Sequence, residues 1–177
     1  MTKALLLTLL VSSTSGLEGQ EPWVRRAGDV LQVAIPTLAV AGTLALKDLE
    51  GTGQFLKSFL TNVATTGALK LAIARERPDG SDDNSFPSGH TSAAFQGASF
   101  IHLRYGWKKG LPAYAGAAFV AFSRVYADKH YVSDVAAGAA LGTASSWIFT
   151  DRFDGVEVRP VSAGGRYGVV MRVVVGF

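Results

Sequence analysis

The 177-residue chain contains no cysteine, which excludes disulfide bonds, thiolate metal sites, iron–sulfur clusters and cysteine nucleophiles. Charged residues are also scarce: they make up 18% of the sequence, whereas an average soluble protein has about 25%. The 17 basic and 14 acidic side chains leave a net charge of +3, too small and too dispersed for the basic stripe of a nucleic-acid-binding protein. We therefore expect no nucleic acid partner.

Apolar residues, by contrast, are abundant: they make up 48% of the chain, and the mean hydropathy is +0.23. At roughly 150 residues per domain, this length corresponds to one domain. Such a domain can bury about 70% of its unfolded surface. The composition indicates an ordered domain with a helical core or a membrane setting. We divide the chain into residues 1–16, a domain over residues 17–151 and a tail over residues 152–177.

The first 16 residues have the order of an export signal. Lys3 precedes an apolar run over residues 4–11, and small polar residues follow; this order is typical of a secretory signal peptide. The run is too short for a spanning helix, which needs roughly 20 residues. The alternative is a short N-terminal helix that stays on the protein.

Hydrophobic periodicity and turn residues predict an all-α fold class. The predicted helices cover residues 23–46, 55–75, 91–105, 111–126 and 131–150. The apolar part of the first helix, residues 30–46, would be about 25 Å long, slightly short of a bilayer core of about 30 Å. Membrane association is therefore expected, whereas a complete span does not follow from the sequence.

A basic turn bears on the orientation in a membrane. Arg104, Lys108 and Lys109 lie at the helix ends opposite the loops that carry the polar motifs. Basic loops of membrane proteins tend to stay in the cytoplasm. We therefore expect a membrane-associated protein of a bacterial-type cell envelope, with its motif-bearing loops facing the periplasm.

Beyond residue 151 the pattern becomes alternating. Residues 156–161 and 166–177 flank a Ser-Ala-Gly-Gly turn, and every second residue from Tyr167 to Phe177 is apolar. This pattern predicts a C-terminal β-hairpin. Because a two-stranded hairpin is marginally stable alone, we expect it to pack on the helices or on another surface.

Polar residues gather at three helix–loop junctions. Three cations beside an apolar core are unfavourable unless an anion binds there, and the planar fork of arginine suits two phosphate oxygens. A glycine before a helix lets the backbone approach closely, and the helix N-terminus attracts an anion. Each cluster alone could be a solvated helix end or an ordinary turn, but together they indicate a phosphate site. The clusters are Lys70 with Arg77; Ser88, Gly89 and His90; and Ser123 and Arg124 with His130 and Asp134.

The histidines indicate chemistry as well as binding. His130 and Asp134 are one helical turn apart, so the carboxylate can fix the imidazole tautomer and leave the other ring nitrogen as a base or nucleophile. His90, on a separate loop, could protonate a leaving oxygen. Alternatively, these three side chains could bind a metal ion, but the nearby cations would repel it. We therefore expect no metal and no cofactor.

The three clusters resemble the signature motifs of the type 2 phosphatidic acid phosphatase (PAP2) superfamily, which includes bacterial acid phosphatases and vanadium haloperoxidases. The resemblance implies a PAP2-like bundle of five to six helices, to which the short C-terminal hairpin is added. The patterns that carry it are Lys70-x6-Arg77-Pro78, Pro87-Ser88-Gly89-His90 and Ser123-Arg124-x5-His130-x3-Asp134.

The resemblance also implies a role for each motif residue. His130 would attack phosphorus and form a phosphohistidine, with Asp134 orienting the ring. His90 would protonate the leaving alcohol and later activate water. Cationic and hydrogen-bonding groups would hold the phosphoryl oxygens without a metal: Lys70, Arg77, Ser88, Gly89, Ser123 and Arg124.

The motifs and the apolar helices together predict a metal-independent hydrolase that removes phosphate from a lipid. Candidate substrates are phosphatidic acid, phosphatidylglycerophosphate, an isoprenoid pyrophosphate and lipid A. The alternatives are a soluble periplasmic acid phosphatase, a vanadium haloperoxidase and a non-catalytic anion-binding membrane protein. The oligomeric state and the role of the hairpin stay open.

Overall fold

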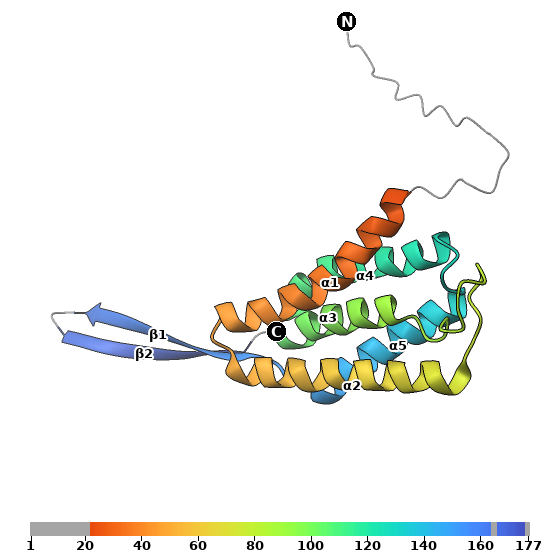
Figure 1. Ribbon diagram of the computed structural model, residues 1–177. Helices are drawn as coiled ribbons and strands as arrows, with labels where there is room; N and C mark the ends of the chain where they lie inside the picture. Colours follow the sequence, from red (N-terminus) through yellow and green to blue (C-terminus); the bar gives the residue numbers. More distant parts are fainter. Residues whose placement is uncertain (1–21, 164–165, 176–177) are drawn as a thin grey trace, which may run out of the picture.

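The computed structural model describes residues 22–163 and 166–175, with side chains described for residues 22–153. The expected signal peptide or N-terminal helix at residues 1–16 lies outside this range. The described part contains five helices, which confirms the expected helical bundle (Figure 1). The helices are α1 (Pro22–Ala45), α2 (Leu49–Ile73), α3 (Gly89–Tyr105), α4 (Trp107–Tyr126) and α5 (Val132–Phe149).

Two helices begin earlier than the sequence pattern suggested. The helix α2 starts at Leu49 because the Asp48 carboxylate accepts a hydrogen bond of 2.8 Å from the backbone N–H of Gly51 and so caps the first turn. The helix α4 starts at Trp107, directly after α3, because Gly106 alone, at a φ of 91°, reverses the chain between them. The predicted turns were therefore too long.

The helix α3 is the centre of the bundle and contacts each of the other four helices. Ala94, Ala98 and Phe100 on this helix are fully buried. The backbone of α5 approaches α3 closely at Gly142, where a Cβ atom would lie 2.2 Å from the carbonyl oxygen of Ser92. Glycine at this position is required by the helix–helix distance.

The up-and-down order of the helices brings the motifs to one end of the bundle. The start of α1, the loop between α2 and α3, and the loop between α4 and α5 all lie at this end (Figure 1). We call it the motif end. The turns after α1 and α3 and the end of α5 lie at the opposite end.

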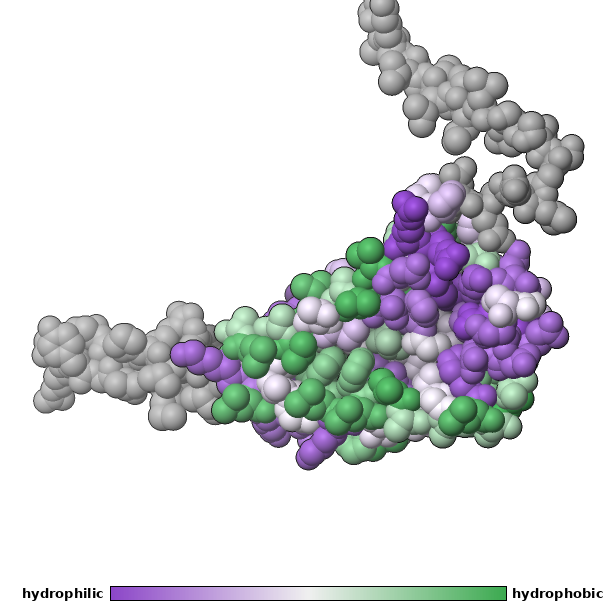
Figure 2. All heavy atoms as spheres, viewed as in Figure 1, coloured by the Kyte–Doolittle hydropathy of each residue, from purple (hydrophilic) through white to green (hydrophobic). Residues whose placement is uncertain are grey.

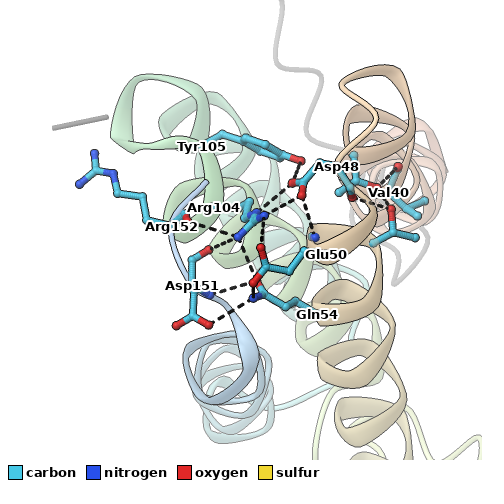
Figure 3. Close-up of polar contacts among 11 residues, drawn as sticks. Val40, Asp48, Glu50, Gln54, Arg104, Tyr105, Asp151 and Arg152 are labelled. Carbon is cyan, nitrogen blue, oxygen red and sulfur yellow. Dashed lines mark hydrogen bonds and ion pairs between the residues drawn. The ribbon is translucent and has the colours of Figure 1, made fainter. Parts of the chain in front are cut away.

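A buried ion pair joins the elements at the opposite end (Figure 3). The guanidinium of Arg104, 2% exposed, donates to both carboxylate oxygens of Asp48, at 2.8 and 2.6 Å. It also donates to the backbone carbonyl of Asp151, and the hydroxyl of Tyr105 donates to Asp48. Arg104 was expected to belong to a basic turn with Lys108 and Lys109. It is instead buried because Asp48 and the carbonyl groups satisfy its donors.

The tail forms strands β1 (Asp154–Ala163) and β2 (Arg166–Val175), which pair antiparallel, with Asp154 opposite Val175. In the described part of the chain the two strands contact each other and none of the five helices (Figure 1). Of the two expected surfaces, the helices are therefore not contacted by the strands as described, and packing on another surface stays a prediction.

The helices expose apolar side chains and bury polar ones. Leu49, Leu71 and Val132 are 79%, 84% and 69% exposed, whereas Asn62 and Gln96 are buried between α2 and α3. Apolar side chains gather over α1 and α2, and hydrophilic ones gather at the motif end (Figure 2). Among the described residues, α1 is the helix that is long and apolar enough to cross a membrane.

Candidate active site

The site is built around His130, which lies in the loop between α4 and α5. Its ring is 3% exposed, and its Nδ1 atom lies 2.6 Å from the carbonyl oxygen of Ser85. Because a carbonyl can only accept, Nδ1 carries the proton and donates. The other nitrogen, Nε2, therefore carries the lone pair, which accepts a long hydrogen bond of 3.5 Å from Arg77 Nη1.

The environment of His130 favours the neutral ring. Burial lowers the pKa of His130 and the positive charge of Arg77 lowers it further, to about 4, although the hydrogen bond to Ser85 acts in the opposite direction. The imidazole is thus uncharged at neutral pH. An uncharged ring with a lone pair on Nε2 is the form required of a nucleophile.

Asp134 is fully buried in the first turn of α5 and makes three hydrogen bonds. Its Oδ1 accepts from Arg75 at 2.7 Å, and its Oδ2 accepts from the Ser85 hydroxyl at 2.5 Å and the Tyr131 backbone N–H at 3.0 Å. The distance to His130 Nδ1 is 3.9 Å. The expected direct hydrogen bond is thus replaced by an indirect connection through Ser85. The Ser85 hydroxyl donates to Asp134, and the Ser85 carbonyl accepts from the His130 ring.

Two cations of the first motif lie on the same side of the site. The Arg77 side chain donates to Asp82 at 2.7 Å and to the Lys129 carbonyl at 3.2 Å. Lys70 donates to the carbonyl of Asn84 at 2.5 Å. The charges of both cations lower the pKa of His130. Both are therefore close enough to stabilise a phosphoryl group at the ring.

The second motif forms the N-terminus of α3. Ser88 is buried at the N-cap and its hydroxyl lies 3.1 Å from that of Thr91, and no side chain of the described residues caps the first turn. A Cβ atom at Gly89 would lie 3.8 Å from Lys70 Cε. Lys70 thus lies beside the N-terminus of α3, and both the lysine and the helix N-terminus favour an anion.

The third cation, Arg124, and His90 meet at a carboxylate from α1. Asp29 Oδ1 lies 2.7 Å from Arg124 Nη1 and 3.1 Å from His90 Nε2. Arg124 also donates to the Arg25 carbonyl at 2.9 Å and to the Ser123 hydroxyl at 3.2 Å. The guanidinium is 3% exposed, so these contacts fix its plane.

The nine predicted residues all lie at the motif end, and the charge of Arg77 acts on both histidines. Sequence reasoning missed Ser85, Arg75 and Asp29. Two of these residues could have been found in the sequence: Arg75 is a further cation beside Arg77, and Asp29 is a carboxylate just before an apolar run. Ser85 could not have been found in this way, because its backbone carbonyl, which any residue has, contacts the His130 ring.

A buried neutral imidazole, a second histidine and three cations at one end of the bundle are the features expected of a phosphatase site. The chain belongs to the PAP2 superfamily, whose family model matches residues 51–155. The resemblance stated from the motifs is thereby confirmed, and the protein is a PAP2 phosphatase.

Two curated relatives are similar in sequence. The Lipid A 4'-phosphatase of Helicobacter pylori (strain J99 / ATCC 700824) is 31% identical over 137 residues, covering 71% of this chain and 69% of that protein. The Lipid A 1-phosphatase of Porphyromonas gingivalis (strain ATCC 33277) is 39% identical over 97 residues, covering 51% of this chain and 22% of that protein. The match thus spans about two thirds of the first relative and a much smaller part of the second.

A solved structure supports the fold. The crystal structure of Aquifex aeolicus LpxE superposes with a TM-score of 0.57 over 72% of this chain and 92% of that chain, at 19% sequence identity. The helical arrangement described above is therefore shared with that protein.

Proposed function

We propose that the protein hydrolyses a phosphate ester of a membrane lipid, of the lipid A type, without a metal ion and through a phosphohistidine on His130. The observation that carries the proposal is the state of that ring: buried and neutral, with Nδ1 donating to Ser85 and the unprotonated Nε2 facing Arg77. Asp134 is a positioning residue, because it acts on the ring through Ser85.

In the first step, the lone pair of His130 Nε2 attacks phosphorus and the bond from phosphorus to the lipid oxygen breaks. His90 gives its proton to the departing alcohol. Lys70, Arg77 and Arg124, together with the N-terminus of α3, stabilise the charge on the phosphoryl oxygens.

In the second step, neutral His90 takes a proton from water, and the resulting hydroxide attacks phosphorus. The phosphorus–nitrogen bond then breaks and inorganic phosphate leaves. His90 is thereby protonated again, and His130 returns to its neutral form. The cations serve both steps, so no metal is needed to neutralise the oxygens.

An apolar cavity supports a lipid as the substrate. The cavity has a volume of about 360 Å³ and lies between α1 and α2, with Val33, Phe55 and Phe59 among its lining residues. Its lining also includes Gln32 and Ala93, which follow Asp29 and His90 by about one helical turn. An acyl chain could therefore lie beside a phosphate held at the motif end. The two curated relatives, both named for lipid A, favour this substrate class.

The distribution of side chains supports a membrane location. Trp23, Trp107 and Trp147 are 61%, 56% and 74% exposed, and tryptophan is enriched at membrane interfaces. Trp23 lies at the motif end and Trp107 at the opposite end. Polar contacts between helices, such as Gln96 with Ser58 at 2.8 Å, are typical of membrane bundles. We propose that the hydrophilic motif end, with both catalytic histidines, projects beyond the apolar band on the periplasmic side.

The test is phosphate release by purified protein from lipid A, phosphatidic acid, phosphatidylglycerophosphate and an isoprenoid pyrophosphate, each with a metal chelator. We expect turnover of a lipid phosphate that is insensitive to chelator and absent in His130→Ala. The matched control is His102→Ala, because His102 packs between Trp107 and Tyr114 at the opposite end. Full activity in His130→Ala would contradict the proposal.

The same assay separates the alternatives. Equal turnover of lipid phosphates and p-nitrophenyl phosphate, by protein soluble without detergent, would favour an acid phosphatase. Bromide oxidation with added vanadate would favour a haloperoxidase. Phosphate binding without turnover of any substrate would favour a binding protein.

A further inference from the structure

We propose that Asp29 of α1 is a positioning residue for the reaction, holding His90 and Arg124 together through one carboxylate oxygen. The inference rests on the proposed function, in which His90 donates the proton to the leaving group. It concerns a residue outside the three motifs and outside residues 51–155, the part of the chain matched by the family.

The geometry around Asp29 is well defined. Its Oδ1 lies 2.7 Å from Arg124 Nη1 and 3.1 Å from His90 Nε2, so one oxygen joins two groups from two different helices. Arg124 reaches α1 a second time, through the Arg25 carbonyl at 2.9 Å.

The close approach of α1 to α4 keeps the carboxylate in place. A Cβ atom at Gly28 would lie 2.0 Å from the Ser123 hydroxyl oxygen. Glycine at residue 28 therefore allows α1 to lie against the third motif, with the next residue, Asp29, directed at Arg124. The carboxylate is 41% exposed, but its position is set by this buried contact.

The contact with Asp29 also determines which nitrogen of His90 can donate a proton to the leaving group. A carboxylate can only accept a hydrogen bond, so Nε2 of His90 carries a proton and donates to Asp29. The nitrogen left for the leaving group is Nδ1. To donate a proton from Nδ1, the ring must carry both protons and a positive charge.

Most neighbouring charges oppose that protonated form. Burial lowers the pKa of His90, and the cations Arg124 and Arg77 lower it further, whereas Asp29 raises it. Lys70 of α2, another cation, lies next to Gly89, and Asp134 of α5 is engaged by Arg75 and Ser85. Asp29 is therefore the carboxylate that directly stabilises the imidazolium form of His90.

The consequence depends on the leaving group. A lipid alcohol is a poor leaving group and needs a proton as its bond to phosphorus breaks, whereas p-nitrophenolate leaves as a stable anion. Loss of Asp29 should therefore slow the first reaction much more than the second, which would lose only the positioning of Arg124. A residue with a merely structural role would affect both equally.

The experiment compares Asp29→Asn with Asp83→Asn, which removes an exposed carboxylate from the loop at the same end. We expect Asp29→Asn to lower kcat for the lipid phosphate roughly tenfold or more, since general acids contribute about 10²–10⁴-fold, with a much smaller change for p-nitrophenyl phosphate. The basic limb of the lipid pH profile should move to lower pH, because fewer His90 rings stay protonated. Asp83→Asn should match the wild type, and Asp29→Glu should recover part of the loss.

A second measurement does not depend on turnover. In a His102→Ala, His130→Ala background, His90 is the single remaining histidine of the sequence, and its ring can be titrated by NMR. Adding Asp29→Asn should lower its pKa; an unchanged pKa would overturn the inference. An equal loss of activity on both substrates, no loss, or a gain of activity would also overturn it. If the wild type releases no phosphate, or His130→Ala stays active, the proposed function fails, and the titration still tests the contact.

Discussion

At the scale of single residues, the proposed chemistry depends on how the two histidines are held. The motif spacing predicted His90, His130 and the three cations as site residues, because phosphate chemistry needs those residue types. The spacing did not reveal what bonds to the rings. The carbonyl of Ser85 holds His130, and a carboxylate from α1 holds His90. Backbone acceptors and partners from distant segments leave no periodic pattern in a sequence.

The titration of His130 tests the account of its environment. Burial and the charge of Arg77 hold its pKa at about 4, below the ordinary 6.5. NMR titration of a His90→Ala, His102→Ala variant should therefore show a neutral ring above about pH 4. Adding Arg77→Gln removes a cation that opposes ring protonation, so the pKa should rise toward its ordinary value.

The lowered pKa of His130 determines how activity should change as the pH falls. Because the nucleophile must be uncharged, turnover should be lost as the pH falls through the pKa of His130. A ring pKa near 6.5 in the otherwise unchanged site, or a pKa that falls on loss of Arg77, would contradict the proposed environment of the nucleophile.

At the scale of the elements, the sequence predicted the helices but misplaced some of their ends. Hydrophobic periodicity identifies the middle of a helix, whereas the start of α2 depends on the Asp48 cap and the start of α4 on Gly106. The tail shows a second limit of sequence-based prediction. Alternation of apolar residues predicted strands, but the surface on which a strand packs is formed by other parts of the chain and is not visible in a local pattern.

The contact between α3 and α5 is where the packing of elements controls the site. Gly142→Val would place side-chain atoms where a Cβ already lies 2.2 Å from Ser92 O and 2.7 Å from Gln96 N. Forcing the helices apart should destabilise the fold by about 1–3 kcal/mol. It should also lower activity, because α5 carries Asp134. Thermal unfolding and phosphate release measure the two effects.

The control for this variant is Gly67→Ala in α2, where a Cβ would meet nothing within 4 Å. Alanine is favoured over glycine inside a helix by roughly 0.5–1 kcal/mol. This variant should therefore keep or slightly raise the unfolding temperature. If Gly142→Val is as stable as the wild type, the close approach of α3 and α5 is not a requirement of the fold.

At the scale of the whole molecule, the two ends of the bundle have different tasks. At the motif end, carboxylates hold two of the motif arginines: Asp82 holds Arg77, and Asp29 holds Arg124. The opposite end holds a closed network in which Arg104 and Asp48 satisfy each other. We expect this network to hold together the helices whose other ends carry the motif residues.

Between the two ends, the exposed apolar side chains predict how the protein sits in a membrane. The chain has no cysteine, so a single introduced cysteine can be labelled without background. Ser81→Cys lies in an exposed loop at the motif end, and Lys108→Cys lies on an exposed turn of α4 at the opposite end.

In intact cells, a membrane-impermeant maleimide should label the variant at residue 81 and leave the variant at residue 108 unlabelled until the membrane is broken. The reverse pattern would place the site in the cytoplasm, whereas labelling of both in cells with an intact inner membrane would mean that the bundle does not separate two compartments. Because both variants lie outside the residues that contact phosphate, phosphate release should persist in each, and that activity shows that the labelled protein is folded.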